Sequence, residues 1–147
     1  MNINKNKTII KTSEQKINWY IIDAKEHKLG RLSSKIAHIL INKNNPNYLP
    51  YQKRSIKIII INSKKIQVTG NKRKQKTYKR HSGRPGGLKI EIFEQLQKRI
   101  PNRILEHSIK GMLPKNSLGR QLIKKIKIYP ENIHPYTNHK PIKLNID

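Results

Sequence analysis

Apolar residues follow two different periods along the chain, and these periods predict its strands and helices. Residues 19–24 form a β-rich apolar run that suits a buried strand, and Asp23 marks its end. After residues 29–31, apolar side chains recur at helical spacing and give one apolar stripe, formed by Leu32, Ile36, Ile39 and Leu40. Asparagine and proline steps between residues 42 and 50 end this helix.

A second strand is predicted at residues 56–61, which include four consecutive isoleucines. A strand that is apolar on both faces is typical of a parallel sheet covered on both sides. Strand, helix and strand in this order favour a βαβ unit with a right-handed crossover. Residues 66–69 are a short run that fits either a further strand or an edge before the segment that follows.

The later part of the chain is predicted to be mainly helical. A helical stripe over residues 92–100 precedes Pro101, which either ends that helix or opens the next one, at residues 101–112. Ser117 is a candidate N-cap for a last helix, and residues 127–129 favour a final strand. Met112 and Leu113 are expected in the core.

These elements predict one α/β domain with an extension at each end. At 147 residues the chain is long enough for one core and short for two. Residues 17–129 hold all the predicted strands and helices. Residues 1–16 are rich in Asn and Lys and are expected to form a flexible basic extension. Proline, histidine, asparagine and lysine dominate residues 130–147, so we expect an extended tail that lies on a partner.

The charge of the chain indicates a polyanionic partner. Lys and Arg total 33 against 8 Asp and Glu, which gives a formal net charge of +25. No acidic residue occurs between Glu26 and Glu91. Such an excess suits RNA or DNA, because each neutralised phosphate releases a condensed counterion. An anionic membrane surface would favour a basic amphipathic helix instead, but the densest charge lies in glycine-rich sequence that looks non-helical.

Candidate catalytic and metal sites are scarce in the sequence. There is no cysteine, which excludes disulfides and thiolate chemistry, and no apolar run approaches the length of a membrane-spanning helix. Glu91 and Glu94 are expected in a first helical turn, where acids complement the helix dipole. The histidines are scattered, and Asp23 fits a turn or a cap. We therefore expect no enzyme activity, no metal, no cofactor, no small-molecule substrate and no membrane contact.

The segment from Thr69 to Lys89 is the main candidate for nucleic-acid contact. Its glycines let the backbone approach a ligand, and Arg84-Pro85-Gly86 predicts a turn that fixes the direction of the cations. Tyr78 and His81 either stack on bases or sugars or, for the tyrosine, pack beneath the loop. The expected RNA-binding residues here are Lys72, Arg73, Lys74, Lys76, Tyr78, Lys79, Arg80, His81, Ser82, Arg84, Gly86, Gly87 and Lys89.

Two further basic groups are candidates for the same interface. The second group lies near Gly111 and Gly119 and extends to Lys125 and Lys127. Its candidate RNA-binding residues are Lys110, Lys115, Arg120 and Lys124. The third contains Arg31, Lys35, Lys53 and Arg54. If the first helix packs by its apolar stripe, Arg31 and Lys35 face outward, where surface exposure alone is the default expectation and RNA contact is the functional one.

Several blocks of the chain resemble the thirteenth-protein family of the large ribosomal subunit. They are Trp19–Ala24, Leu29–Leu32, Val68–Lys72, His81–Gly83, Gly86–Lys89, Lys110–Lys115 and Leu118–Arg120. The resemblance implies a three-layer α/β/α domain on a short, mainly parallel sheet. It also implies binding to large-subunit (23S-type) rRNA, early entry into subunit assembly, and neighbouring large-subunit ribosomal proteins as partners. The Pro85-Gly86-Gly87 form is similar to plastid members, with a bacterial cytoplasm or another organelle as alternatives.

The chain departs from that family pattern at two places. Lys53-Arg54-Ser55-Ile56 stands where the family usually has Asp-Thr-Gly-Asp, and Asn116-Ser117 stands where the family has Gly-Pro. A structural rRNA-binding protein is the first hypothesis. An RNA-processing enzyme would need an acid/base pair or metal ligands that the sequence does not offer. A nucleoid-type DNA binder would bind duplex DNA as strongly as folded rRNA.

Overall fold

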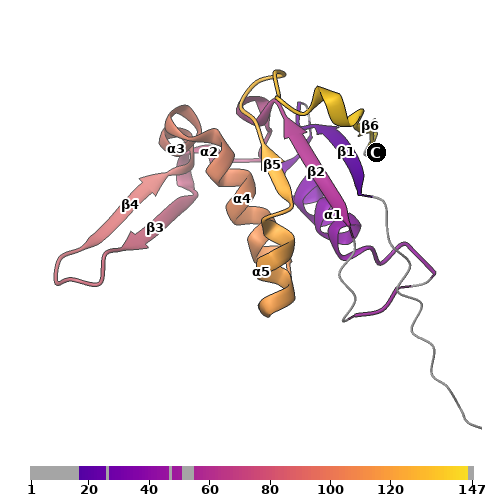
Figure 1. The fold of residues 1–147 in the computed structure, drawn as a ribbon. Coiled ribbons are helices and arrows are strands. Elements are labelled where there is room, and N and C mark those ends of the chain that lie inside the picture. The colour runs from indigo at the N-terminus through magenta and orange to yellow at the C-terminus, as the bar shows by residue number, and fades with distance from the viewer. Residues whose placement is uncertain (1–16, 26, 47, 51–54, 146–147) are drawn as a thin grey trace, which may run out of the picture.

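A four-stranded parallel sheet forms the centre of the computed structural model, which describes residues 17–25, 27–46, 48–50 and 55–145. The strand order is β5-β2-β1-β6. The strands are β1 (Asn18–Asp23), β2 (Ile56–Ile61), β5 (Ile126–Ile128) and β6 (Ile142–Lys143). The expected α/β class on a short parallel sheet is confirmed, as are the first two predicted strands (Figure 1).

Strand β2 has apolar side chains buried on both of its faces. It pairs with β1 along its whole length, from Asn18 opposite Ile56 to Asp23 opposite Ile61. Because successive side chains point to opposite faces, Ile58 and Ile60 enter one apolar cluster, while Ile59 and Ile61 enter another. The four isoleucines therefore join the sheet to two separate layers.

Helices supply the layer on one face of the sheet. They are α1 (Leu29–Ile41), α3 (Phe93–Arg99), α4 (Pro101–Met112) and α5 (Ser117–Ile123). The predicted stripe of α1 is buried except for Ile39, which is half-buried and still packs on the cluster. Asn42 ends α1 in the left-handed conformation, and Pro101 opens α4 at its first position, where a missing N–H has no cost.

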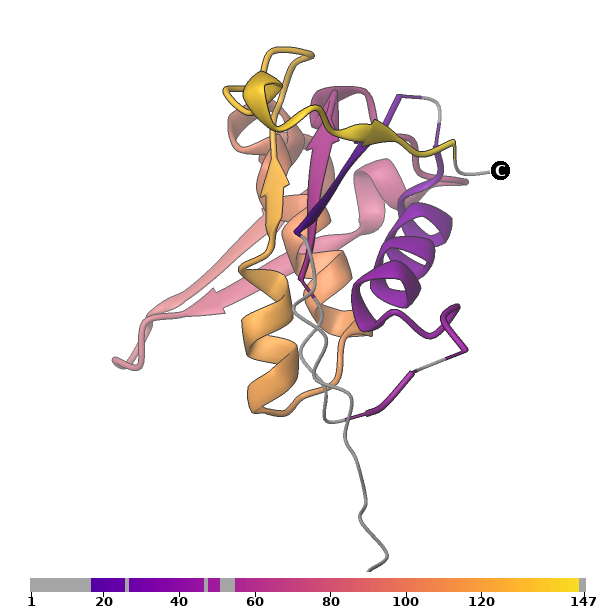
Figure 2. The ribbon, with the colours of Figure 1, turned by 45° about the vertical axis from the view of Figure 1, so that its right-hand side comes forward.

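The C-terminal segment covers the other face of the sheet. Trp19 stacks on His139 with ring centroids 4.3 Å apart and lies 5.0 Å from Tyr136. This segment contains the 3₁₀ turn η2 (Thr137–His139), which is followed by β6, and β6 pairs with β1. The segment crosses the sheet in Figure 2. The third layer is thus thin, and Tyr136, His139 and β6 of the expected tail contact the protein's own sheet.

The basic segment after residue 69 is more regular than the sequence suggested. It forms a short helix α2 (Lys72–Gln75) and a two-stranded antiparallel hairpin, β3 (Thr77–His81) with β4 (Leu88–Ile92). The expectation of a non-helical loop is therefore wrong for α2. Ile92 ends β4 and does not belong to the following helix, because its backbone is extended just before α3 begins. In both views the hairpin projects from the body as a separate arm (Figures 1 and 2).

Three smaller predictions need correction. Asn116, not Ser117, caps α5, since its side-chain oxygen accepts a 2.8 Å hydrogen bond from the Gly119 N–H. Met112 is exposed at the end of α4, while Leu113 is buried as expected. The strand expected at residues 127–129 lies at Ile126–Ile128 and is followed by β6.

The link from β2 to the arm contains the 3₁₀ turn η1 (Ser63–Lys65) and no full strand. Residues 66–69, which fitted either a strand or an edge, contribute only an isolated parallel bridge between Gln67 and Lys28. Among the described helices, none is long and apolar enough to cross a membrane. The expected extension at residues 1–16 lies outside the described residues.

Gly119 and Gly111 make a matched pair for testing the packing of α5. A Cβ on Gly119 would lie 1.8 Å from the Pro114 carbonyl oxygen, whereas a Cβ on Gly111 would meet no atom within 4 Å. We expect Gly119→Ala to lower the free energy of unfolding by about 1–3 kcal/mol or more. Gly111→Ala should leave it unchanged or raise it by up to about 1 kcal/mol, because alanine is the better helix former.

Urea unfolding followed by circular dichroism measures both effects. Equal stability of the two variants would contradict the close approach of Gly119 to Pro114.

Candidate nucleic-acid interface

The arm formed by β3 and β4 displays two different faces. Opposite residues of an antiparallel pair share a face, so the pairing of Arg80 with Lys89 puts both cations on one side. Tyr78 and Glu91 lie on that same side. The other side carries Lys79 and the β4 residues Leu88, Ile90 and Ile92, whose exposed fractions are 52%, 53% and 36%. The arm therefore combines cations with an exposed apolar row.

A tight turn closes the tip of the arm, as the sequence predicted. The Gly87 N–H donates a 2.9 Å hydrogen bond to the Arg84 carbonyl, and the Ser82 N–H donates one of 3.1 Å to the Gly87 carbonyl. Gly86 has a φ of +71°, which suits the third position of a type II turn after Pro85. A Cβ on Gly87 would lie 2.0 Å from the Ser82 hydroxyl oxygen. These glycines shape the tip, which leaves the Arg84 side chain exposed.

His81 takes part in the same tip. Its Nδ1 accepts a 2.9 Å hydrogen bond from the Gly83 N–H, and the residue is exposed. Ser82 is exposed as well. Both predicted site residues are therefore exposed at the tip of the arm.

Three carboxylates of the described residues pair with cations outside the 69–89 segment. Glu131 pairs with Lys64 at 2.8 Å, Glu94 with Lys98 at 3.5 Å and Glu91 with Arg99 at 2.5 Å. The hydrogen bond and charge of Lys64 lower the pKa of Glu131. Asp23 instead accepts hydrogen bonds from the Lys25 N–H and the Asn62 side chain, which confirms its expected turn role.

No described carboxylate pairs with a cation of the 69–89 segment. These cations are all exposed, and they are Lys72, Arg73, Lys74, Lys76, Lys79, Arg80, Arg84 and Lys89. Repulsion between like charges on one arm is relieved when an anion binds there. The arm is therefore the part of the described structure best suited to a polyanion.

Tyr78 packs beneath the arm. Its ring lies 5.5 Å from that of His107 in an edge-on arrangement and 6.4 Å from that of Phe93, and it packs against the main core. Its hydroxyl is buried and has no hydrogen-bond partner among the described residues. Burial also raises the pKa of this phenol. These contacts support the packing role of the two roles weighed for Tyr78.

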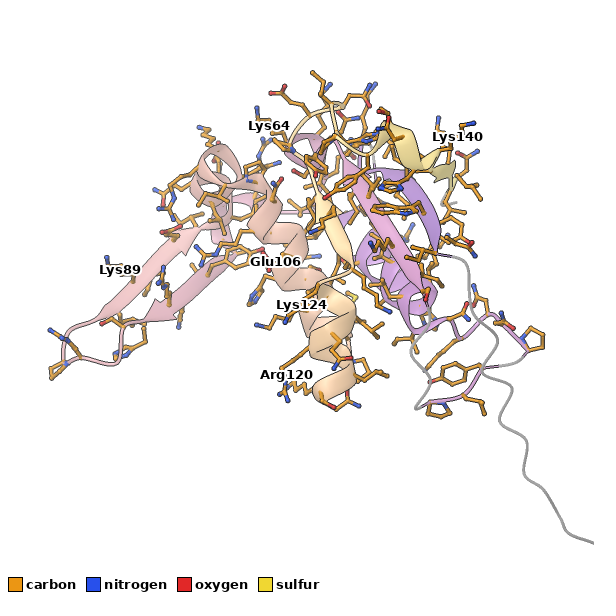
Figure 3. All side chains as sticks on the ribbon, viewed as in Figure 1. Lys64, Lys89, Glu106, Arg120, Lys124 and Lys140 are labelled. Carbon is orange, nitrogen blue, oxygen red and sulfur yellow. The ribbon has the colours of Figure 1, made fainter. Side chains whose placement is uncertain are left out.

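The second basic group lies on and around α5. Lys110 is at the end of α4, and Lys115 is in the turn that follows. Arg120 and Lys124 are four residues apart on α5 and its C-cap (Figure 3). All four predicted residues of this group are exposed. Of the two glycines expected to permit close approach, Gly119 is packed against Pro114, while Gly111 is open.

The third group is only partly described. Arg31 and Lys35 are exposed on α1, as its apolar stripe predicted. Lys53 and Arg54 lie outside the described residues. Arg31 lines a cavity together with Lys72 and Lys76, so the structure joins the first and third groups. No sequence pattern indicated this proximity, because some 40 residues separate Arg31 from α2.

The acidic pair considered in the sequence does not share a helical turn. Glu94 lies in the first turn of α3, but Glu91 lies in β4 and is paired with Arg99. Within the described part of the chain, no three His, Cys, Asp or Glu side chains gather where a metal ion could bind. The exposed row of Leu88, Ile90 and Ile92 was missed, although its alternation with Lys89 and Glu91 is the usual sign of a strand.

An α/β domain with exposed cations on a projecting arm, and carboxylates paired elsewhere, is typical of a nucleic-acid-binding protein. The family model "Ribosomal protein L13" matches residues 17–135. The chain therefore belongs to the ribosomal protein L13 family, in agreement with the resemblance of its sequence blocks.

Three relatives illustrate how far this similarity extends. The large ribosomal subunit protein uL13c of Gracilaria tenuistipitata var. liui is 57% identical over 136 residues, which cover 92% of this chain and 95% of the relative. The protein of the same name from Porphyra purpurea is 54% identical over 136 residues, covering 92% and 96%. The large ribosomal subunit protein uL13 of Crocosphaera subtropica is 55% identical over 129 residues, covering 88% and 85%.

Replacing Tyr78 by phenylalanine tests the packing role of its ring. The change removes a buried hydroxyl without a partner among the described residues, so we expect the free energy of unfolding at neutral pH to rise by about 1 kcal/mol or more. Tyr129→Phe is the control, because the Tyr129 hydroxyl forms a hydrogen bond with Tyr136. Its removal should lower the free energy of unfolding by about 0.5–1.5 kcal/mol.

The pH dependence of Tyr78→Phe has a defined sign. Burial raises the pKa of the Tyr78 phenol in the folded state above its value of about 10 in the unfolded state. The folded state therefore favours the neutral phenol, and this preference stabilises the fold at pH values below the unfolded pKa. That contribution is lost as pH rises through the raised pKa. The free energy of unfolding should therefore fall less for the phenylalanine variant than for the wild type when urea titrations are carried out at increasingly alkaline pH. A variant that is less stable than the wild type at neutral pH would contradict this account.

Proposed function

We propose that this chain is a structural constituent of the large ribosomal subunit that binds large-subunit (23S-type) rRNA and supports early subunit assembly and hence translation. The observation that carries the proposal is the set of exposed cations in α2 and the β3–β4 arm that no described carboxylate neutralises. Membership of the ribosomal protein L13 family supports it. The proposal includes no catalytic step.

The proposed contacts come from three parts of the molecule. The arm and α2 bind phosphates, and the glycine-rich tip allows the RNA backbone to approach the protein backbone closely. The end of α4, α5 and the start of α1 add further cations. The residues to which we assign rRNA contact are Arg31, Lys35, Lys72, Arg73, Lys74, Lys76, Lys79, Arg80, His81, Ser82, Arg84, Gly86, Gly87, Lys89, Lys110, Lys115, Arg120 and Lys124.

Neighbouring large-subunit proteins are the second class of partner in this proposal. The exposed apolar row of the arm is compatible with such a contact. A plastid ribosome is the proposed location, supported by the two relatives named uL13c from Gracilaria and Porphyra. The similarity to the Crocosphaera protein keeps a bacterial cytoplasm as the alternative location.

Salt dependence tests the electrostatic part of the proposal. With about 6–10 phosphate contacts, affinity for a large-subunit rRNA fragment should fall by about 10³–10⁵ between 50 and 200 mM salt. Filter binding at a series of salt concentrations measures the slope. A nearly constant affinity over this range would show that charge neutralisation is not the source of binding.

A second experiment tests whether α2 and the arm together are the main contact. Replacing Arg73, Arg80 and Arg84 together with alanine should weaken rRNA binding by at least about 10²-fold, if each lost contact costs roughly 1 kcal/mol. The matched control replaces the three ion-paired cations Lys64, Lys98 and Arg99, which removes the same formal charge. The control should lose much less affinity.

Circular dichroism of both triple variants checks that the fold is retained. Equal affinities of the two variants would mean that α2 and the arm have no special role in binding.

A further inference from the structure

A cavity of about 390 Å³ lies between the start of α1, the segment before α2, α2 itself and the end of α4. It brings together residues that are distant in the chain, from position 28 to position 112. Its lining residues are Lys28, Leu29, Gly30, Arg31, Val68, Thr69, Lys72, Lys76, Ser108 and Met112. The volume is in the lower part of the range for small-molecule sites, about 300–1,000 Å³.

Four of the lining residues are cations, and none is acidic. Lys28, Arg31, Lys72 and Lys76 are all exposed. None of them pairs with a carboxylate among the described residues. The Lys72 ammonium donates a 3.2 Å hydrogen bond to the Thr69 hydroxyl, so its position at the cavity is partly fixed. The cavity is therefore strongly positive and suited to a phosphate.

The remaining lining residues differ from those of a plain basic surface. Met112 is 42% exposed, although a methionine at the end of an amphipathic helix was expected in the core. Its thioether can make favourable contacts with an aromatic ring. Leu29 and Val68 add apolar surface, and Thr69 and Ser108 add hydroxyl groups. An aromatic, polar and anionic ligand would match all of these groups.

A second cavity nearby lacks these properties. Its volume is about 290 Å³, and it is lined by Lys64, Lys65 and Arg73, among others. Lys64 is already paired with Glu131, and the Gln97 amide there donates to the Lys64 and Ile66 carbonyls. Two of its polar side chains, Lys64 and Gln97, are thus already engaged within the protein.

We propose that the larger cavity holds one unstacked nucleotide of the bound rRNA. The four cations bind its phosphate, the Met112 side chain packs on the base, and the Thr69 and Ser108 hydroxyls bond the sugar or a base edge. The cavity has room for one nucleotide and not for a duplex. Lys72 and Lys76 also belong to the series of cations that continues into the arm, so the strand leaving the cavity meets further cations. This inference rests on the proposed rRNA binding.

Two variants separate the base contact from the phosphate contact. Met112→Ala changes no charge, and Ile133→Ala is its control, because Ile133 is 82% exposed and does not line the cavity. The double variant Lys28→Ala/Lys72→Ala removes two cavity charges. Its control is Lys79→Ala/Lys89→Ala, which removes two charges from the arm.

The measurement is chemical probing of base accessibility across a large-subunit rRNA fragment, together with affinity at several salt concentrations, using the full chain. We expect one nucleotide that is protected by the wild type to become reactive with Met112→Ala. Affinity should fall about two- to tenfold in that variant with an unchanged salt slope. Lys28→Ala/Lys72→Ala should expose the same nucleotide and reduce the slope by about one per lost contact.

The arm control should reduce the slope as well but leave that nucleotide protected, and Ile133→Ala should match the wild type. If the wild type binds rRNA and neither cavity variant changes the reactivity of any nucleotide, the cavity is not a nucleotide site. If the wild type itself fails to bind rRNA, the proposed function fails first. Ser108→Ala provides a second uncharged variant, with the same nucleotide as its readout.

Free ligands distinguish an RNA site from a small-molecule site. Isothermal titration with AMP and with inorganic phosphate should give no binding at submillimolar concentration, because the neighbouring contacts of the RNA strand are missing. Submillimolar binding of AMP without protection of any rRNA nucleotide would overturn the assignment to rRNA.

Discussion

The burial of β2 on both faces is the constraint on which the rest of the molecule depends. Ile58 and Ile60 pack under the helices, and Ile59 and Ile61 pack under the C-terminal segment. Each fully buried side chain of this size contributes about 1.5–3 kcal/mol, so this one strand supplies much of the drive for both layers to assemble. The one charged side chain of the strand is Lys57, near its start, which is half-buried with its ammonium 4.6 Å from the centre of the Trp19 ring. Many of the other cations are carried by the arm, by turns and by helix ends, where a partner can reach them.

The few carboxylates of the described residues are distributed in a way that sharpens this separation. Cations near α3 and η1 are neutralised by Glu91, Glu94 and Glu131. No described carboxylate pairs with the cations of the arm itself. Exposed ion pairs of this kind contribute little stability. Their main effect is to reduce the positive potential near α3 and η1, while the cations of the arm and of the cavity beside α1 stay without a described carboxylate partner.

The sequence was sufficient wherever one period of apolar residues dominated a segment. The strands at Asn18–Asp23 and Ile56–Ile61 and the helix at Leu29–Ile41 were predicted on that basis, and the turn at Arg84–Gly87 was predicted from its proline and glycine residues. The hairpin was not, since the segment up to Lys89 was interpreted as a loop and Ile92, the last residue of the apolar row, was assigned to a helix that begins one residue later. The cavity and the pairing of β6 with β1 were also beyond prediction, because each joins residues separated by 80 or more positions in the chain.

The pairing of β6 with β1 has a consequence for the order in which the chain can fold during its own synthesis. Strand β1 is made first, but the segment that shields its outer face, from Tyr136 to Leu144, is made last. A nascent chain lacking that segment can form the helical layer while Trp19 and Ile59 still face solvent. Completion of the sheet is thus a late, non-local step, which topology makes slow relative to the helices. The arm will already have left the peptide exit tunnel when that step occurs.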